Sequence, residues 1–223
     1  MGDVKSFQEL VKNGNLDAVR AELARDPSLL DATNEAGQSS FLLANYYRQP
    51  AIAEHLLSLG PKLDLFTSCV AGRTEAVLEQ IDRDPNLLES HSSDGWTPLH
   101  LAAFFGQAEL AKGLLNRGAA IEARSTNAMR NTPLHAAAAG ANVDLVKLLL
   151  ESGADPDAQQ HGGWTALHAA AQTGNVEMAK TLLAHGADLG ARAENNQSAL
   201  DMALLHARGD VAGLLENSGV QLQ

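Results

Sequence analysis

One seven-residue segment recurs along the chain and constrains its fold more than any other feature. It starts at Thr97, Thr132 and Thr165, where it reads TPLHLAA, TPLHAAA and TALHAAA, and a weaker copy, SALDMA, starts at Ser198. The four starts are 35, 33 and 33 residues apart, and an apolar stretch with helical spacing follows each copy. Such a period predicts one structural unit stacked several times, because a single unit cannot bury its own apolar face.

Each copy carries the signals of a helix pair. Threonine is a good N-cap and proline suits the first helical position, so Thr97-Pro98 predicts a helix start. The alanines that follow have small side chains, which keep the diameter of this helix small. A second helix has apolar residues at 143, 146, 149 and 150, and Gly153 supplies the left-handed residue that ends it. Dipeptides such as Asp94-Gly95 then predict a tight hairpin turn before the next threonine.

These segments resemble the ankyrin-repeat family, whose unit of about 33 residues carries the signature T-P-L-H-x-A. The resemblance implies an all-α repeat solenoid, in which stacked helix pairs carry short β-hairpin fingers. It covers nearly the whole chain, so we expect a single ankyrin-repeat domain over residues 1–223. The expected units number about seven and are approximately residues 3–36, 37–63, 64–88, 95–121, 130–156, 163–189 and 196–222.

Two irregularities in the spacing predict local differences between units. An apolar residue that follows the turn recurs along the chain, and its spacing drops to 25 residues between Leu63 and Leu88. The missing residues fall between Leu63 and Phe66, so the third unit should lack its projecting finger. A two-residue insertion between Gly118 and Thr132 should lengthen one finger.

The composition argues against several kinds of partner and site. The chain has 16 Lys and Arg against 27 Asp and Glu, a formal net charge of -11, and its cations lie singly from Lys5 to Arg208. This pattern disfavours nucleic acid and anionic membrane surfaces as partners. The lone Cys69 excludes an intrachain disulfide and a thiolate metal site. Its alignment with Ala103 and Ala138 predicts a buried, unreactive thiol.

No apolar run approaches the roughly 20 residues of a membrane span, and the N-terminus lacks a secretory signal. We therefore expect a cytoplasmic protein, and we also expect a monomer. The segment Met1 to Ser6 fits the loose myristoylation pattern M-G-x-x-x-[ST], but a capping box of Ser6 and Glu9 explains the serine without acylation. Polar residues at the ends of the chain predict polar caps on the stack, and those at the C-terminal end are Glu216, Asn217 and Ser218.

Three equivalent histidines, His100, His135 and His168, invite a metal or catalytic interpretation. Stacked units place equivalent atoms about 8 to 10 Å apart, which is too far for one coordination sphere. The resemblance implies instead that each histidine holds its own hairpin to its own helix. The same place is taken in the weaker units by Leu42, Phe66 and Asp201. Because no nucleophile, phosphate-binding or HExxH motif occurs, we predict no catalytic residue, no metal site and no cofactor.

Most of the aromatic residues gather at equivalent positions. One pair ends the first helix of units two and four, and a tryptophan or asparagine precedes the threonine of later units. In the ankyrin family these positions lie on the concave face, where partners usually bind, and aromatic side chains anchor protein interfaces. The resemblance therefore implies a non-catalytic protein-interaction module or adaptor that binds another protein. The predicted partner-binding residues are Tyr46, Tyr47, Trp96, Phe104, Phe105, Asn131 and Trp164.

Alternatives stay open from the sequence alone. The aromatic residues can equally represent local packing of each turn on its helix. A small molecule or peptide could bind in a notch at the third unit, flanked by Tyr47 and Phe104, with the chain acting as an accessory to an enzyme. Arg48 and Arg73 are the charged candidates for that site. A scaffold that stacks end to end is disfavoured by the polar ends.

Overall fold

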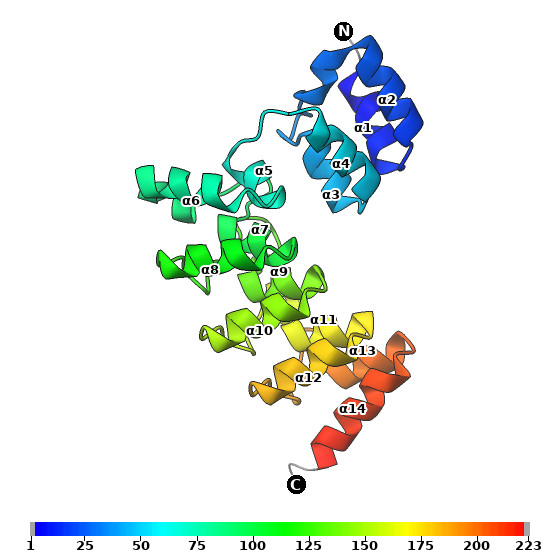
Figure 1. Ribbon diagram of the computed structural model, residues 1–223. Coiled ribbons are helices and arrows are strands. Elements are labelled where there is room, and N and C mark those ends of the chain that lie inside the picture. Colours follow the sequence, from blue (N-terminus) through cyan, green and yellow to red (C-terminus); the bar gives the residue numbers. More distant parts are fainter. Residues whose placement is uncertain (1–2, 221–223) are drawn as a thin grey trace. The chain divides into compact units, whose positions relative to one another are not determined.

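The computed structural model describes residues 3–220, which form helices and connecting turns (Figure 1). The chain divides into two compact units, residues 1–73 and residues 74–223. The first unit contains α1 (Val4–Lys12), α2 (Leu16–Arg25), α3 (Ser40–Tyr46), α4 (Pro50–Ser58) and α5 (Leu65–Val70). The second contains α6 (Thr74–Arg83), α7 (Pro98–Phe104), α8 (Ala108–Asn116), α9 (Pro133–Ala139), α10 (Val143–Glu151), α11 (Ala166–Thr173), α12 (Val176–Ala184), α13 (Ala199–Leu205) and α14 (Gly209–Val220). Short 3₁₀ helices are η1 (Pro27–Leu30), η2 (Pro85–Glu89) and η3 (His161–Gly163).

In the second unit the helices form two rows. The first row is α7, α9, α11 and α13, and the second row is α6, α8, α10, α12 and α14 (Figure 1). Each helix contacts its neighbours in the same row, and α7, α9, α11 and α13 also pack against the helix that follows them in sequence. This arrangement, in which each helix pair touches the next pair, is that of an all-α repeat solenoid.

The first-row helices begin where their sequences predict. The hydroxyl oxygens of Thr97 and Thr132 accept the backbone N–H of the third helical residue, and Pro98 and Pro133 occupy the first helical position. Thr165 takes the same place before α11, with alanine instead of proline after it. These caps satisfy N–H groups that have no partner inside the helix, so the recurring segment sets each helix start locally.

Aliphatic side chains hold the two rows together. Leu99, Leu134 and Leu167 of the first row are buried, and Leu149 and Leu182 of the second row are fully buried. The alanines predicted to keep the first-row helices thin are buried as well, at positions 102, 103, 136–138, 170 and 171. Since the distance between packed helices depends on the side chains at the contact, these alanines allow a close approach.

The first unit starts with α1, whose N-cap is Asp3. The Asp3 carboxylate accepts hydrogen bonds from the Lys5 backbone N–H at 3.0 Å and from the Ser6 hydroxyl at 2.5 Å. The predicted capping box of Ser6 and Glu9 is therefore wrong, because Ser6 lies inside the helix and the earlier aspartate takes the cap. Residues 1–2, which begin the myristoylation pattern, lie outside the described part of the chain.

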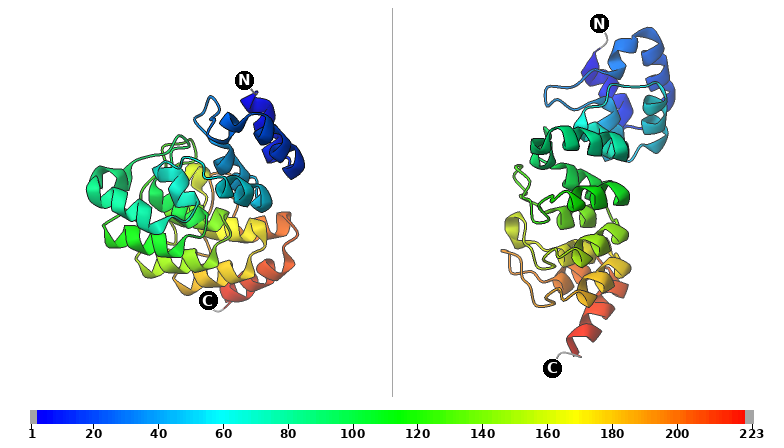
Figure 2. Two further views of the ribbon diagram at one scale, coloured as in Figure 1. Left: turned by 45° about the horizontal axis from the view of Figure 1, so that its top comes forward. Right: turned by 60° about the vertical axis from the view of Figure 1, so that its left-hand side comes forward.

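Turns, which project along one side of the second unit, precede its first-row helices (Figure 2). A backbone hydrogen bond from Ser92 N–H to the Trp96 carbonyl closes one turn, and the bond from Gln160 to Trp164 closes another, both at 2.9 Å. The predicted β-hairpin fingers are not confirmed, because residues 3–220 contain no β-strand. Across residues 3–220 the β-type pairing consists of two isolated bridges, Thr33 with Ser39 and Arg192 with Ser198.

The connections between helices have the lengths that the spacing predicted. Only residues 59–64 join α4 to α5, whereas residues 84–97 join α6 to α7. The connection from α8 to α9 spans residues 117–132, which is longer than the connection 152–165 from α10 to α11. The segment before α5 therefore lacks the turn found elsewhere, and the segment before α9 carries an extended one.

The start of α5 corrects one alignment made from the sequence. Asp64 is the N-cap of this helix, and it forms a reciprocal capping box with Thr67. Counted from the cap, Thr67 and not Phe66 takes the place that His100 has in α7. The register differs because the shortened connection brings an aspartate to the cap, where α3, α7, α9, α11 and α13 have serine or threonine.

Of the polar residues predicted to cap the C-terminal end, Glu216 and Asn217 are exposed on α14, but α13 also exposes leucines at this end. Leu204 and Leu205 of this helix are 58% and 65% exposed. Counted from the helix cap, Leu204 matches Ala171, which is fully buried in α11. In α11 the next first-row helix packs alongside, whereas α13 is the last helix of its row in residues 3–220. The C-terminal end of the second unit therefore presents apolar as well as polar side chains.

Candidate functional site

A buried histidine links each central helix start to the turn of the following repeat. The Nδ1 atom of His100 lies 2.8 Å from the Thr97 hydroxyl oxygen, and its Nε2 atom lies 2.9 Å from the Asn131 carbonyl oxygen. A carbonyl oxygen can only accept a hydrogen bond, so Nε2 carries the proton and Nδ1 accepts. One imidazole thus holds two segments that are 31 residues apart in sequence.

The same link recurs in the next two repeats. His135 Nε2 donates to the Trp164 carbonyl at 3.0 Å, and His168 Nε2 donates to the Gln197 carbonyl at 3.1 Å. The prediction that each histidine holds its own hairpin is therefore wrong, although each does contact the threonine of its own helix. Stacking brings the following turn against the helix start, and its carbonyl is the acceptor within reach.

Burial keeps these imidazoles neutral. Desolvation lowers the pKa of His100 and of His135 to about 4, against the opposing effect of the hydrogen bond to the carbonyl. The pKa of His168 is lowered for the same reason. Because both ring nitrogens form hydrogen bonds within the protein, these side chains hold the turns in position. Nowhere in residues 3–220 do three His, Cys, Asp or Glu side chains gather as a metal ion would require.

Acidic side chains make a second set of links, which were not predicted from the sequence. Glu89 accepts a hydrogen bond from the Ala120 backbone N–H at 2.8 Å, and Glu122 accepts one from Asp155 at 2.9 Å. The same bond joins Asp157 to Asp188 N–H and, in the first unit, Asp31 to Lys62 N–H. Each of these acids directly follows the apolar residue that recurs after the turn of each repeat. Their recurring position in the repeat, rather than their charge, was therefore the sequence signal that could have identified them.

The lone cysteine has the environment of an inert thiol. Cys69 is fully buried, and burial raises the pKa of its thiol to about 12. The nucleophilic thiolate therefore does not form at neutral pH. Counted from the helix caps, Cys69 matches Ala102 and Ala137, one residue before the alanines predicted from the sequence. The predicted burial is confirmed.

In the second unit, three of the predicted aromatic residues form one cluster. The Phe104 ring meets the Trp96 ring edge-on, with 5.1 Å between centroids, and meets the Phe105 ring at 4.9 Å. Trp164 contacts His168 of its own repeat at 5.4 Å. All four aromatic side chains are neither fully buried nor fully exposed. Local packing therefore accounts for part of their surface, and the remainder faces solvent.

The tyrosine pair belongs to the first unit. Tyr46 is partly exposed, and Tyr47 is 51% exposed with the Lys12 ammonium 5.6 Å from its ring centroid. Such a contact between a cation and an aromatic face is weakly attractive at an exposed site. Because Tyr47 and Phe104 belong to different units, the notch proposed between them stays a prediction.

A surface hollow of about 620 Å³ lies within the first unit, between α1 and the turn at residues 33–36. Charges of both signs line it, including Lys5, Glu9 and Glu35. Neither Arg48 nor Arg73 is among the lining residues. This hollow therefore lends no support to the predicted small-molecule site at the third repeat.

Asn131 is the remaining residue of the predicted partner-binding set, and it is only 8% exposed. Its side-chain oxygen accepts a hydrogen bond from the Ser125 hydroxyl at 2.7 Å, and its carbonyl accepts one from His100. These contacts stabilise the turn before α9 and leave little of Asn131 for a partner.

Comparison with protein families bears on the same part of the chain. The family model described as "Ankyrin repeat" matches residues 94–126, and the model described as "Ankyrin repeats (many copies)" matches residues 134–183. A search of curated proteins found no match. The matched residues extend from the turn before α7 to α12. Together with the stacked helix pairs, these matches show that the chain carries ankyrin repeats within residues 94–183.

Proposed function

We propose that the chain is a non-catalytic protein-interaction module that binds a partner through the face carrying its aromatic residues. Ankyrin repeats generally act as protein–protein interaction modules and are typically non-catalytic. The observation that carries the proposal is the half-buried cluster of Trp96, Phe104 and Phe105. Buried aliphatic residues hold the helix rows together, and part of the surface of each of these rings is exposed to solvent.

The packing of the cluster suits an interface anchor. Each ring of the cluster Trp96, Phe104 and Phe105 packs edge-on against a neighbouring ring. The side chains are therefore already restricted, and a partner that binds them would lose little side-chain entropy. Burying the remaining apolar surface would contribute about 25 cal/mol per Å² of area removed from water. Trp164, two repeats further on, extends the proposed surface of the second unit. In the first unit, Tyr46 and Tyr47 are the proposed partner-binding residues.

The remaining proposals concern where the chain acts and with what. We propose a cytoplasmic monomer that forms one domain of about seven repeats. We also propose that it binds no nucleic acid, because its net charge is -11 and its cations are scattered. None of the helices in the described range combines the length and the apolar character needed to cross a membrane.

Paired binding and stability measurements test the proposal. We expect Phe104→Ala/Phe105→Ala to weaken capture of a partner from native cell extract by at least about 2 kcal/mol if either ring is a hot spot. The thermal melt should change little in comparison. Leu115→Ala is the matched control, because it truncates a half-buried apolar side chain on α8. Equal loss of capture in the control, or a melt that collapses in the double variant, would assign the rings to packing.

A further inference from the structure

The turn before α9 differs from the other turns at one backbone position. Two residues before the helix cap, φ is positive at Gly37 (75°), Gly95 (78°) and Gly163 (73°). Asn196 takes this position with φ of 65°, and Arg130 takes it with φ of 49°. Left-handed backbone favours glycine and then asparagine, because a larger side chain crowds the carbonyl group. Arg130 is therefore held at a conformational cost that the other four turns reduce or avoid.

Polar contacts fix this turn to both of its neighbours. The Arg124 guanidinium donates hydrogen bonds to the carbonyls of Arg130, at 3.2 Å, and of Gln159 in the following turn. The Asn127 side chain donates to the Asp94 carbonyl of the preceding turn at 2.9 Å. These hydrogen bonds hold the extended turn in one conformation, so the turn would lose little conformational entropy when a partner binds.

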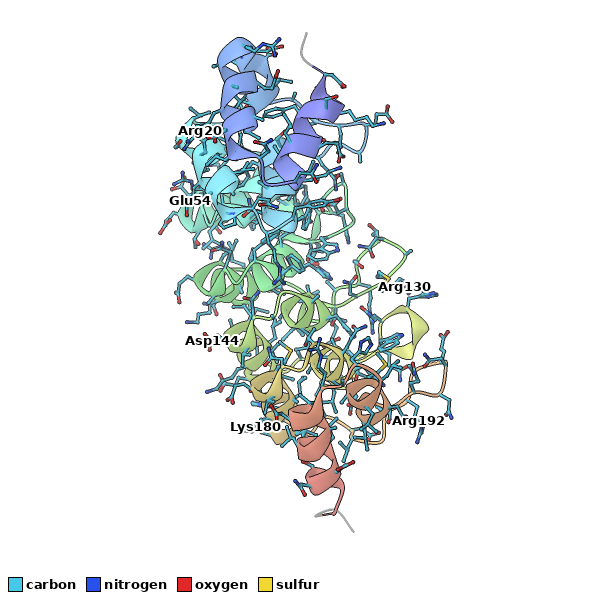
Figure 3. The ribbon with its side chains drawn as sticks, turned by 90° about the vertical axis from the view of Figure 1, so that its right-hand side faces the viewer. Arg20, Glu54, Arg130, Asp144, Lys180 and Arg192 are labelled. Carbon is cyan, nitrogen blue, oxygen red and sulfur yellow. The ribbon has the colours of Figure 1, made fainter. Side chains whose placement is uncertain are left out.

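Two side chains project from the tip of this rigid turn. Met129 is 45% exposed and Arg130 is exposed. Figure 3 shows Arg130 on the turn side of the second unit, and Asp144 and Lys180 on its helix side. Among the described residues, no acceptor lies within hydrogen-bond or ion-pair distance of the Arg130 guanidinium. The arginines of the second unit that do bond a carboxylate or a carbonyl are Arg83, Arg117, Arg124, Arg192 and Arg208.

The charge around the tip is opposite to that of the unit that carries it. Residues 74–223 contain nine Lys and Arg against eighteen Asp and Glu. The extended turn, residues 123–132, contains two arginines and no acid, the following turn, residues 158–165, contains no acid, and the preceding turn, residues 92–97, contains one, Asp94. The Arg130 guanidinium makes no ion pair with it, and such an unpaired guanidinium is complementary to a carboxylate on another molecule.

We propose that Met129 and Arg130 form a docking tip for an acidic segment of a partner protein. A carboxylate of the segment pairs with the Arg130 guanidinium through two N–H groups, and an adjacent apolar side chain covers the Met129 thioether. This proposal rests on the proposed function of the chain as a protein-interaction module, and it names the chemistry of the partner. It also explains why a long charged residue occupies a position that favours glycine.

Selection from a random peptide library displayed on phage tests the docking tip. The full chain is immobilised, enriched peptides are synthesised, and their affinities are measured for the wild type, Arg130→Gly, Lys180→Ala and Phe104→Ala/Phe105→Ala. Glycine suits the positive φ at this position, so the Arg130→Gly variant should melt no lower than the wild type. Lys180→Ala removes a cation from the helix side of the same unit. We expect enrichment of peptides with Asp or Glu beside an apolar residue, and an affinity about five- to tenfold lower for Arg130→Gly alone among the single variants.

The outcomes separate the two proposals. Peptides that bind Arg130→Gly as well as the wild type but lose affinity for Phe104→Ala/Phe105→Ala would overturn the docking tip and leave the proposed function standing. Acidic peptides that depend on Arg130 and not on the phenylalanines would support the tip and contradict the role of the aromatic cluster. Enrichment of basic peptides would overturn the docking tip, and the absence of any enrichment would count against both proposals.

Discussion

The Nε2 atom of His100 lies 2.9 Å from the carbonyl oxygen of Asn131, 31 residues further along the chain. The first unit makes the same kind of link with a different side chain, because Gln8 Nε2 donates to the Gln38 carbonyl at 3.0 Å. Both Gln8 and His100 are buried. In both cases a side-chain N–H group donates a hydrogen bond to a carbonyl of the following turn. The imidazole of histidine and the amide of glutamine are the two groups that supply this donor.

We expect the free energy of unfolding to fall as the pH drops from about 6.5 to about 4. The pKa of His100 and of His135 is lowered to about 4 in the folded chain, whereas histidine in an unfolded chain titrates near 6.5. In this window the unfolded state binds more protons, so stability that is fully present at neutral pH is lost on acidification. The loss is about 1.4 kcal/mol per unit of pKa difference for each histidine. Urea unfolding over this pH range measures it.

His135→Gln is the control for this pH dependence. Glutamine keeps an N–H donor for the Trp164 carbonyl, as Gln8 does for the Gln38 carbonyl, but it does not titrate. Carboxylates contribute the same acid dependence to both proteins, so the difference between the two curves isolates the imidazole. Stability that falls equally steeply in wild type and variant would contradict the burial argument.

Leu149→Ala should destabilise the chain by about 2 to 5 kcal/mol, because it leaves a cavity where a fully buried side chain stood in α10. Urea unfolding of the full chain measures the change. Leu148→Ala on the same helix is the matched control, since this leucine is only partly buried and should cost less. Equal losses in the two variants would show that the stack is not held by the interior face of α10.

Replacing Ser40 should stabilise the chain by about 0.5 to 1 kcal/mol. The Ser40 hydroxyl is buried without a hydrogen-bond partner in the described structure, and the equivalent position holds Pro98 in α7. Ser40→Ala removes the unsatisfied group, and Ser40→Pro also restricts the unfolded chain. The preceding Ser39 has the extended backbone that a following proline requires, with ψ of 159°.

Ser39→Ala provides the opposite control in a thermal melt. It deletes the N-cap of α3, whose hydroxyl accepts the Leu42 backbone N–H at 3.2 Å, and should cost about 1 kcal/mol. A lower melting temperature for both Ser40 variants would show that the hydroxyl has a stabilising partner after all.

Arg130→Gly should raise the free energy of unfolding by about 1 kcal/mol, because it relieves the left-handed backbone of a residue with a Cβ atom. Gly95→Ala should lower it, since a Cβ atom there would lie 2.6 Å from the Thr126 hydroxyl oxygen and 2.7 Å from the Asn127 backbone nitrogen. Urea unfolding of both variants measures whether the free energy of unfolding rises or falls. A destabilised Arg130→Gly variant would mean that the arginine side chain stabilises the fold.

The helix starts and the aliphatic core could be predicted from the sequence because both depend on local chemistry. A threonine followed by proline satisfies free N–H groups at a helix end wherever it occurs, so Thr97 and Thr132 were recognisable as caps without any tertiary information. The period of the repeat then placed Leu99, Leu134 and Leu167 at equivalent buried positions. Even the shortened connection before α5 followed from counting residues.

The links between repeats were decided only by the tertiary structure. Whether His100 reaches its own turn or the next one depends on how closely two helices stack and which carbonyl the following turn directs inward. The same holds for the acids such as Glu122, whose acceptor role is visible only when a backbone N–H from another repeat stands beside it. Exposure of Leu204 likewise depends on whether a neighbouring helix covers its position. Caps and periodicity are local properties of a chain, whereas these contacts are properties of its stacking.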